Sequence, residues 1–332
     1  MPSPDRLVDR FGRVHNNLRI SVTDRCNIRC TYCMPETVRF LPKSSLLSFE
    51  EITRFVRVAA TLGIDKIRLT GGEPLVRRDL PKLVEAIAEI PGIVDVGLTT
   101  NGILLAPLAR SLRDAGLERI NISLDTLDPG RFFELTRRAG LEQAIEGILA
   151  AKDAGFRPIK INAVAIKGQT DADVVPLGRF CREHDLDLRF IEYMPLDAGN
   201  LWERGKVLLA SEILAALETE IGPLSPIPNP DLRSPSLDYA YADGRGKVGV
   251  IASVSQPFCA SCNRVRLTAE GKLRNCLFAL DETDVRDLLR EGTDDEPIRR
   301  ALLDSVADKW AGHQINTIDF VKPERLMHSI GG

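Results

Sequence analysis

Strand-like and helix-like stretches alternate along the chain from residue 18 to about residue 195. Six short runs rich in apolar and β-branched residues are typical of buried strands, and amphipathic stretches lie between them. Repeated units of one strand and one helix predict a parallel sheet with right-handed crossovers. Six units can curl into an incomplete barrel or form an open, doubly wound sheet, and the periodicity fits both. The predicted strands are residues 18–24, 66–72, 94–102, 119–125, 159–168 and 188–194.

End signals support two of the intervening helices. In residues 48–63, Ser48 and Glu51 fit a capping box at the start of a helix. Residues 105–117 read as a helix with a glycine near its C-cap. These signals strengthen the prediction of an α/β fold.

The pattern changes at residues 218–237, where five prolines disfavour regular strand pairing and predict an extended connector. Shorter strand-like pieces follow at residues 247–255 and 264–278, and two helical stretches come after them. We therefore expect a barrel-like domain over residues 1–222 and a smaller domain over residues 223–332.

Composition narrows the choice of function. Among the 332 residues, 44 basic and 47 acidic side chains give a net charge of -3, so no global positive field indicates nucleic acid or anionic lipid as a partner. No apolar run approaches the ~18 residues of a membrane span, and the polar start lacks the apolar stretch of a secretory signal. We expect a cytoplasmic protein in which any anion-binding site is a local cluster.

Six of the seven cysteines fall into two groups of three. Thiols stay reduced in the cytoplasm, so clustered cysteines are more typical of metal ligands or nucleophiles than of disulfides. The seventh, Cys181, lies in a helix-like stretch, where we expect a buried, inert thiol. The groups are Cys26, Cys30 and Cys33, spaced C-x3-C-x2-C after the first strand, and Cys259, Cys262 and Cys276, spaced C-x2-C-x13-C.

Three thiolates can hold three irons of a cubane iron–sulfur cluster and leave the fourth iron open to a ligand. Structural zinc would need a fourth Cys or His, and His15 is a remote candidate for the first group. For the second group, a small zinc ribbon completed by a distant histidine stays an alternative.

Basic side chains lie inside the predicted strands, although parallel strands covered on both faces should be almost entirely apolar. Side chains alternate with period two, which puts Arg19 on one face with Ser21 and Arg68 on one face with Thr70. Several basic side chains facing a barrel interior would need an anion to offset their positive charge. A triphosphate would do so. The alternative is that these side chains reach solvent or pair with helix carboxylates. The residues concerned are Arg19, Lys66, Arg68, Lys160 and Arg189.

Two segments resemble known motifs. Residues 26–33, CNIRCTYC, resemble the cysteine motif of the radical S-adenosylmethionine (SAM) superfamily, and residues 70–74, TGGEP, resemble its segment for the methionine end of SAM. With the second cysteine triplet and the terminal IGG, the pattern resembles the GTP 3',8-cyclase family, also called molybdenum cofactor biosynthesis protein A, over nearly the whole chain. The resemblance implies an α/β fold with an incomplete (β/α)6 radical SAM barrel and a smaller C-terminal α+β domain that carries a second cluster.

The resemblance also implies an activity. The enzyme would be a lyase that converts GTP to (8S)-3',8-cyclo-7,8-dihydro-GTP, the first step of molybdenum cofactor biosynthesis. A 5'-deoxyadenosyl radical formed from SAM would take the hydrogen from ribose C3', and C3' would then bond to guanine C8. The implied cofactors are two 4Fe–4S clusters and SAM.

By the same resemblance, each cysteine triplet holds one cluster, and the open iron of the second holds the guanine ring. The SAM contacts are Tyr32, Gly72, Glu73, Ser123 and Met194. The GTP contacts are Arg19, Lys66, Arg68, Thr99, Lys160, Arg189, Arg264 and Arg266. Arg264 and Arg266 join the first triplet as the catalytic set. The terminal Gly331 and Gly332 are expected to enter the active site.

The resemblance further implies an external electron donor and a functional link to the cyclic pyranopterin monophosphate synthase, and it leaves a homodimer open. One alternative is a radical SAM peptide maturase with an auxiliary cluster, which would have no need for a basic interior. Another is a zinc-stabilised nucleic-acid-binding module, which predicts a basic exterior that the net charge disfavours.

Overall fold

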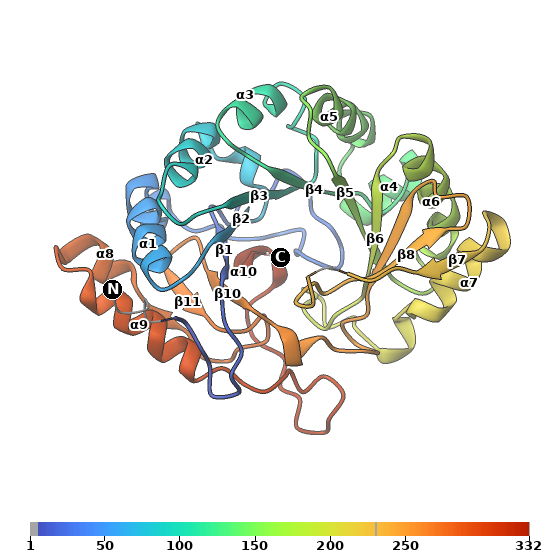
Figure 1. The fold of residues 1–332 in the computed structure, drawn as a ribbon. Coiled ribbons are helices and arrows are strands. Elements are labelled where there is room, and N and C mark those ends of the chain that lie inside the picture. The colour runs from blue at the N-terminus through green and yellow to red at the C-terminus, as the bar shows by residue number, and fades with distance from the viewer. Residues whose placement is uncertain (1–5, 230, 332) are drawn as a thin grey trace.

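The computed structural model describes residues 6–229 and 231–331. In these residues the strands form one mixed sheet of twelve strands, in the order β12-β11-β10-β1-β2-β3-β4-β5-β6-β9-β8-β7, which curves around a central space without closing (Figure 1). The strands are β1 Asn17–Ser21, β2 Lys66–Thr70, β3 Asp95–Thr100, β4 Arg119–Ser123, β5 Ile159–Ala165, β6 Asp187–Glu192, β7 Leu224–Pro226, β8 Leu237–Tyr241, β9 Lys247–Ile251, β10 Arg264–Leu267, β11 Lys272–Arg274 and β12 Thr283–Asp284.

Helices cover the outer face of this curved sheet, except for the short α10, which lies near the central space beside the C-terminus (Figure 1). The capping box that the sequence predicts for α1 is confirmed, because Ser48 and Glu51 each bond the other's backbone N–H. The α-helices are α1 Phe49–Thr61, α2 Leu80–Ala88, α3 Ala109–Asp114, α4 Pro129–Thr136, α5 Leu141–Asp153, α6 Val174–Glu183, α7 Ala210–Glu220, α8 Arg286–Glu291, α9 Glu296–Ala307 and α10 Met327–Ile330.

Strands β1 to β6 are parallel and follow one another in chain order, with helices between them. The predicted α/β fold is therefore confirmed, and the curvature of the sheet around a central space, with helices on its outer face, decides in favour of an incomplete barrel. The carboxyl ends of the parallel strands lie at one rim of this barrel, which is where ligands collect in such folds.

The C-terminal part of the chain adds strands at both edges of the six-stranded barrel. β10 pairs in parallel with β1, and β9 pairs in parallel with β6. The proline-rich segment predicted as a connector includes the end of α7 and the short strand β7. The division between residues 222 and 223 stays a prediction, since the strands that follow it continue the same sheet.

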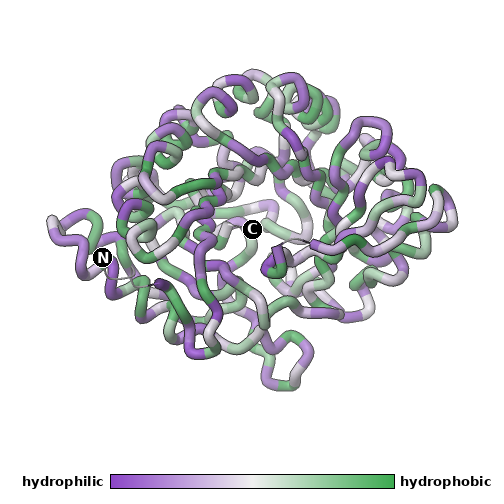
Figure 2. The backbone as a smooth tube through the Cα atoms, viewed as in Figure 1, coloured by the Kyte–Doolittle hydropathy of each residue, from purple (hydrophilic) through white to green (hydrophobic). Residues whose placement is uncertain are grey.

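The main hydrophobic core lies between the sheet and its covering helices. Leu18 and Ile20 of β1 and Phe55 of α1 are fully buried in it. Cys181 of α6 is also buried there, as the sequence predicts. Hydrophobic and hydrophilic positions interleave along strands and helices alike (Figure 2). Within the described ranges, no helix combines the length and apolar composition that crossing a membrane requires.

The contact between α5 and the loop after β3 gives a test of this packing. A Cβ atom on Gly147 would lie 2.2 Å from the carbonyl oxygen of Gly102, so we expect Gly147→Ala to destabilise the fold by about 1–3 kcal/mol. Gly205 has open space around its Cβ position and no positive φ, which makes Gly205→Ala a matched control expected within about 0.5 kcal/mol. Urea unfolding of both variants measures the difference, and equal midpoints would contradict this close approach of the two backbones.

Candidate functional site

One cavity of about 590 Å³ occupies the centre of the barrel. Its walls combine the first cysteine triplet with inward-facing side chains of the parallel strands, so residues far apart in the sequence meet there. The sequence-predicted residues that line it are Arg19, Cys26, Cys30, Tyr32, Cys33, Lys66, Arg68, Gly72, Glu73, Thr99, Ser123, Lys160, Arg189, Met194, Arg264 and Arg266.

The first triplet lies on the loop that follows β1. Cys33 and Met34 both donate their backbone N–H to the carbonyl oxygen of Cys30 at 2.9 Å, which makes a tight turn. The three thiols are free and partly exposed to the cavity. Burial raises the pKa of Cys26 to about 11 and that of Cys33 to about 12, so these thiols need a bound cation to become thiolates. Free, cavity-facing thiols on one short loop fit the ligand set of an iron–sulfur cluster.

The TGGEP segment packs directly against the start of the cysteine loop. The N–H of Gly72 donates to Thr23 at 2.7 Å, and the N–H of Glu73 donates to Arg25 at 2.8 Å. A Cβ atom on Gly72 would lie 2.4 Å from the carbonyl oxygen of Arg25. Glycine is therefore needed here because two backbones approach closely.

Glu73 is buried beside this crossing. Its carboxylate accepts hydrogen bonds from the N–H of Leu75 at 3.0 Å, from the hydroxyl of Thr100 at 2.7 Å and from the N–H of Asn101 at 2.7 Å. Burial outweighs these hydrogen bonds and raises the pKa of Glu73 to about 7. A ligand cation at this end of the cavity would favour the ionised form.

A second carboxylate lies near the first triplet, and sequence analysis does not assign it. The hydroxyl of Tyr32 donates to Asp125, whose other oxygen accepts from the N–H of Val164 at 2.8 Å. Burial raises the pKa of Asp125 to about 6. Its position at the end of the predicted strand 119–125, two residues after Ser123, is the signal that could have found it.

Three arginines share one level of the barrel. In the sheet register, Arg19 of β1 lies beside Arg266 of β10 on one side and beside Arg68 of β2 on the other. Strands lie ~4.8 Å apart, so the three guanidinium groups crowd one another. The residue next to Arg68 on β3 is Gly97, where a Cβ atom would lie 3.3 Å from the guanidinium carbon. Glycine there leaves room for the arginine side chain.

Most of these cations form no ion pair with a carboxylate, although the negative charges of Asp95 and Asp187 act on Arg68 and Lys160 respectively from a longer distance. Burial, followed by the like charge of neighbouring cations, lowers the pKa of Arg68 to about 9 and that of Lys160 to about 8. Lys66 is the exception, because its ammonium lies 3.4 Å from Asp231. Over residues 6–229 and 231–331, no ion pair within 4.0 Å involves Arg19, Arg68, Lys160, Arg189, Arg264 or Arg266. Pairing with helix carboxylates, which the sequence left open as an alternative, is therefore not what the structure shows for Arg19, Arg68, Lys160 and Arg189.

Asparagines that the sequence analysis missed share the same inward face. The side-chain oxygens of Asn17, Asn121 and Asn162 are buried without a hydrogen-bond partner, and all three line the cavity. Each lies two positions from a predicted site residue on the same strand, so the period of two was the available signal. Unpartnered amide oxygens add acceptors for a polar ligand.

The second triplet lies just outside the cavity wall. Cys259 begins a short 3-10 turn, Cys262 precedes β10, and Cys276 follows β11. Phe258, Arg264 and Leu277, which lie close to these cysteines in the chain, line the cavity. The fit to a second cluster rests on three free thiols carried by neighbouring strand ends.

The described residues give no support to the zinc alternative. Across the described ranges, no group of three His, Cys, Asp or Glu side chains surrounds a single-ion site. His15 instead contacts Asp9 at 3.0 Å.

Gly331 is buried, and its carbonyl oxygen accepts a hydrogen bond from Arg266. Gly332 lies outside the described residues.

The close crossing at Gly72 predicts a specific defect. We expect Gly72→Ala to displace the cysteine loop and lower the affinity of the first triplet for its cluster by about 10- to 100-fold, the range typical of changes just behind metal ligands. Iron content after anaerobic reconstitution measures the loss, with Gly205→Ala as the control. Full iron loading in the Gly72 variant would contradict the predicted displacement.

Comparisons with known proteins agree with this geometry. The model of the Radical SAM superfamily matches residues 20–181, and that of Molybdenum Cofactor Synthesis C matches residues 186–315. The solved structure of Streptococcus suis SuiB bound to precursor peptide SuiA shares the fold with a TM-score of 0.57 at 18% identity, over 94% of this chain and 74% of that one. Methylornithine synthase gives a TM-score of 0.50 at 18% identity, over 62% of each chain.

Curated relatives are much more similar. The GTP 3',8-cyclase of Rhodopirellula baltica is 49% identical over all of this chain and 94% of its own length. GTP 3',8-cyclase 2 of Mycobacterium tuberculosis is 47% identical over all of this chain and 94% of its own length. The chain therefore belongs to the radical SAM superfamily and, within it, to the GTP 3',8-cyclase family.

Proposed function

We propose that this protein is a GTP 3',8-cyclase, which converts GTP to (8S)-3',8-cyclo-7,8-dihydro-GTP with the help of SAM and two 4Fe–4S clusters. The observation that carries the proposal is the set of unpaired arginine and lysine side chains facing the same cavity as the first cysteine triplet. Buried charges need an opposite charge, and a triphosphate supplies one. A peptide substrate gives no reason for this arrangement.

One end of the cavity suits SAM. Cys26, Cys30 and Cys33 would hold the first cluster, which on binding SAM supplies the 5'-deoxyadenosyl radical chemistry of the superfamily. The Gly72–Glu73 backbone and the buried Glu73 carboxylate suit the ammonium group of SAM. Tyr32, Ser123 and Met194 line the same cavity and complete the proposed SAM contacts.

The other end suits GTP. The adjacent Arg266, Arg19 and Arg68 would bind phosphate oxygens through charge-assisted hydrogen bonds. Arg264 lies on β10, two residues beyond Cys262, so the guanine ring could reach a cluster on the second triplet. Orienting ribose C3' between the two ends would be most of the catalytic contribution of the protein. The remaining proposed GTP contacts are Lys66, Thr99, Lys160 and Arg189.

The C-terminal tail is proposed to complete the site. Gly331 has a φ of +79°, and a Cβ atom there would lie 2.3 Å from the hydroxyl of Thr70. Gly331 thus fits beside Arg266 because it has no side chain.

Partners beyond GTP follow from the proposed reaction. An external donor has to supply the electron that reduces the first cluster. A cyclic pyranopterin monophosphate synthase would consume the cyclised nucleotide. A homodimer is compatible with the proposal and is not required by it.

The first test follows the hydrogen atom. The reconstituted protein is incubated anaerobically with SAM, a strong reductant and GTP deuterated at C3', and the 5'-deoxyadenosine is analysed by mass spectrometry. We expect deuterium in the deoxyadenosine, because the radical would abstract from C3'. Deoxyadenosine without deuterium would keep the radical SAM chemistry and remove GTP C3' as the target.

The second test separates the two ends of the cavity. We expect Arg68→Met to weaken GTP binding by about 10- to 100-fold, because a charge-assisted hydrogen bond contributes about 1.5–3 kcal/mol, and to leave SAM binding unchanged. The unfolding midpoint of the ligand-free protein should be unchanged or higher, since an unpaired buried charge is removed. Isothermal titration with each ligand gives both affinities.

The matched control for this test is Arg182→Met, which removes an arginine paired with Asp243 on the outside of the sheet. That variant should bind GTP and SAM normally. If Arg68→Met bound GTP as tightly as the unchanged protein, the proposed phosphate contact would be wrong.

A further inference from the structure

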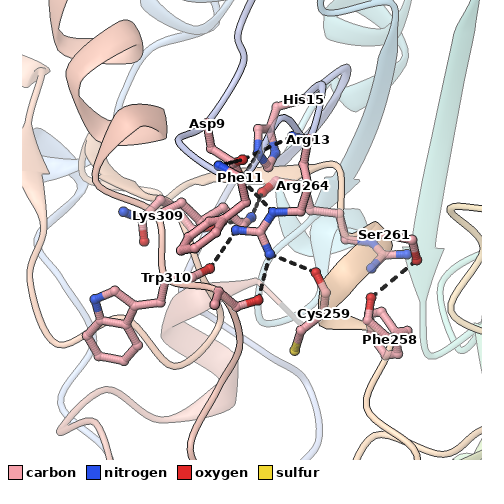
Figure 3. A network of polar contacts seen from close by, with 12 residues as sticks. Asp9, Phe11, Arg13, His15, Phe258, Cys259, Ser261, Arg264, Lys309 and Trp310 are labelled. Atoms are coloured by element: carbon pink, nitrogen blue, oxygen red, sulfur yellow. Dashed lines mark hydrogen bonds and ion pairs between the residues drawn. The ribbon is translucent and has the colours of Figure 1, made fainter.

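The second cysteine triplet is held by groups to which the proposed function gives no role. Its cysteines come from the turn before β10 and from the end of β11, so separate segments have to stay in register. Figure 3 shows two distant parts of the chain near Cys259: residues 9–15 and the segment at Lys309 and Trp310 that follows α9. Of these residues, Lys309 contacts the segments that carry the other two cysteines, Cys262 and Cys276.

Lys309 is a buried lysine, only 3% exposed. Its ammonium donates to the carbonyl oxygens of Arg264 and Asn275, both at 2.6 Å. Arg264 lies two residues after Cys262, and Asn275 directly precedes Cys276. One side chain therefore joins the two segments that supply these cysteines.

The same ammonium supplies charge to the triplet. Its positive charge acts on Cys262 and then on Cys276. Because the ammonium bonds the carbonyl oxygens of Arg264 and Asn275, a buried positive charge lies beside the segments that carry Cys262 and Cys276.

An N-terminal clamp fixes the segment that carries Lys309. The guanidinium of Arg13 donates to the carbonyl oxygens of Cys259 at 2.7 Å, Ala311 at 2.8 Å and Trp310 at 2.5 Å (Figure 3). Its Nε bonds the carboxylate of Asp9 at 2.5 Å. Because these contacts tie residues 310 and 311 to Cys259, the lysine beside them has little freedom to move away.

We propose that Lys309 is a positioning residue of the second cluster, whose ammonium holds the Cys262 and Cys276 segments together and offsets the negative charge of the thiolate-bound cluster. A cluster gains one negative charge when an electron donor reduces it by one electron. A fixed positive charge next to it stabilises the reduced form and raises the reduction potential. The inference rests on the proposed function in one respect, namely that the second triplet holds an iron–sulfur cluster.

Three substitutions separate the charge from the hydrogen bonds. Lys309→Arg keeps both, Lys309→Gln keeps donors without charge, and Lys309→Met removes both. Each is made in the full chain with Cys26, Cys30 and Cys33 replaced by serine, so that any cluster signal comes from the second triplet. Iron content and the midpoint potential, followed by electron paramagnetic resonance during a reductive titration, are measured after anaerobic reconstitution.

We expect the arginine variant to match the unchanged background in iron content and potential. The glutamine variant should keep its iron and show a lower potential. The methionine variant should show about 10- to 100-fold weaker cluster binding as well, the usual cost of losing a group behind the ligands. Lys322→Met is the control, because Lys322 also bonds a backbone carbonyl, at Asp197, but makes no contact with the triplet.

An unchanged potential in the glutamine variant would overturn the role of the charge, whatever the fate of the methionine variant. Full iron loading in a folded methionine variant would overturn the role of the hydrogen bonds. If the Cys-to-Ser background with Lys309 intact bound no iron, the inference would fall together with the second cluster of the proposed function. If only the Lys309 variants give results that contradict the inference, the proposed function is unaffected.

Discussion

Crowding of positive charge inside the barrel is the constraint on which the rest of the site depends. Arg266, Arg19 and Arg68 lie at one level on three adjacent strands, without carboxylate partners. Like charges at neighbouring strand positions repel, and desolvating them costs free energy. A closed barrel filled with apolar side chains could not tolerate them. An unclosed sheet around a cavity can, because water or an anion can reach the guanidinium groups.

The topology of the sheet produces this crowding. Parallel pairing of β10 with β1 brings Arg264 and Arg266 beside the N-terminal strand, although some 245 residues separate them in the chain. The same pairing carries the second cysteine triplet to the edge of the cavity, because Cys262 lies just before β10. The pairing of β10 with β1 therefore positions both the crowded arginines and the second triplet. A shift of β10 along β1 would displace both.

Local signals in the sequence predict much of this arrangement. Spacing identifies both cysteine triplets, and alternation with period two places Arg19 and Arg68 on the inward face, where the structure also has them. The six barrel strands were predictable because each is a short run of apolar and β-branched residues bounded by turns. These features depend on residues close together in the chain.

The features that could not be predicted from the sequence depend on contacts between residues far apart in the chain. Glu192 is fully buried at the end of β6, where its carboxylate accepts hydrogen bonds from the N–H groups of Val254 and Ser255 and so fixes the chain entering the second triplet. No local pattern marks a glutamate for that role. The pairing of β9 and β10 with the barrel edges, like the bond from Tyr32 to Asp125, likewise depends on segments that meet only in the folded chain.

Charge also distinguishes the two ends of the cavity. Near the first triplet lie the buried carboxyl groups of Glu73 and Asp125, whose pKa values burial raises to about 7 and about 6. Near the second triplet lie Arg264 and Lys309, which lower the pKa of Cys262. SAM carries a sulfonium and an ammonium group, whereas GTP carries a triphosphate. A cation would restore the ionised carboxylates at the acidic end, and an anion would relieve the repulsion at the basic end. Each ligand therefore removes an electrostatic cost that the other would increase, so the charge distribution favours one orientation of the two substrates in a single cavity.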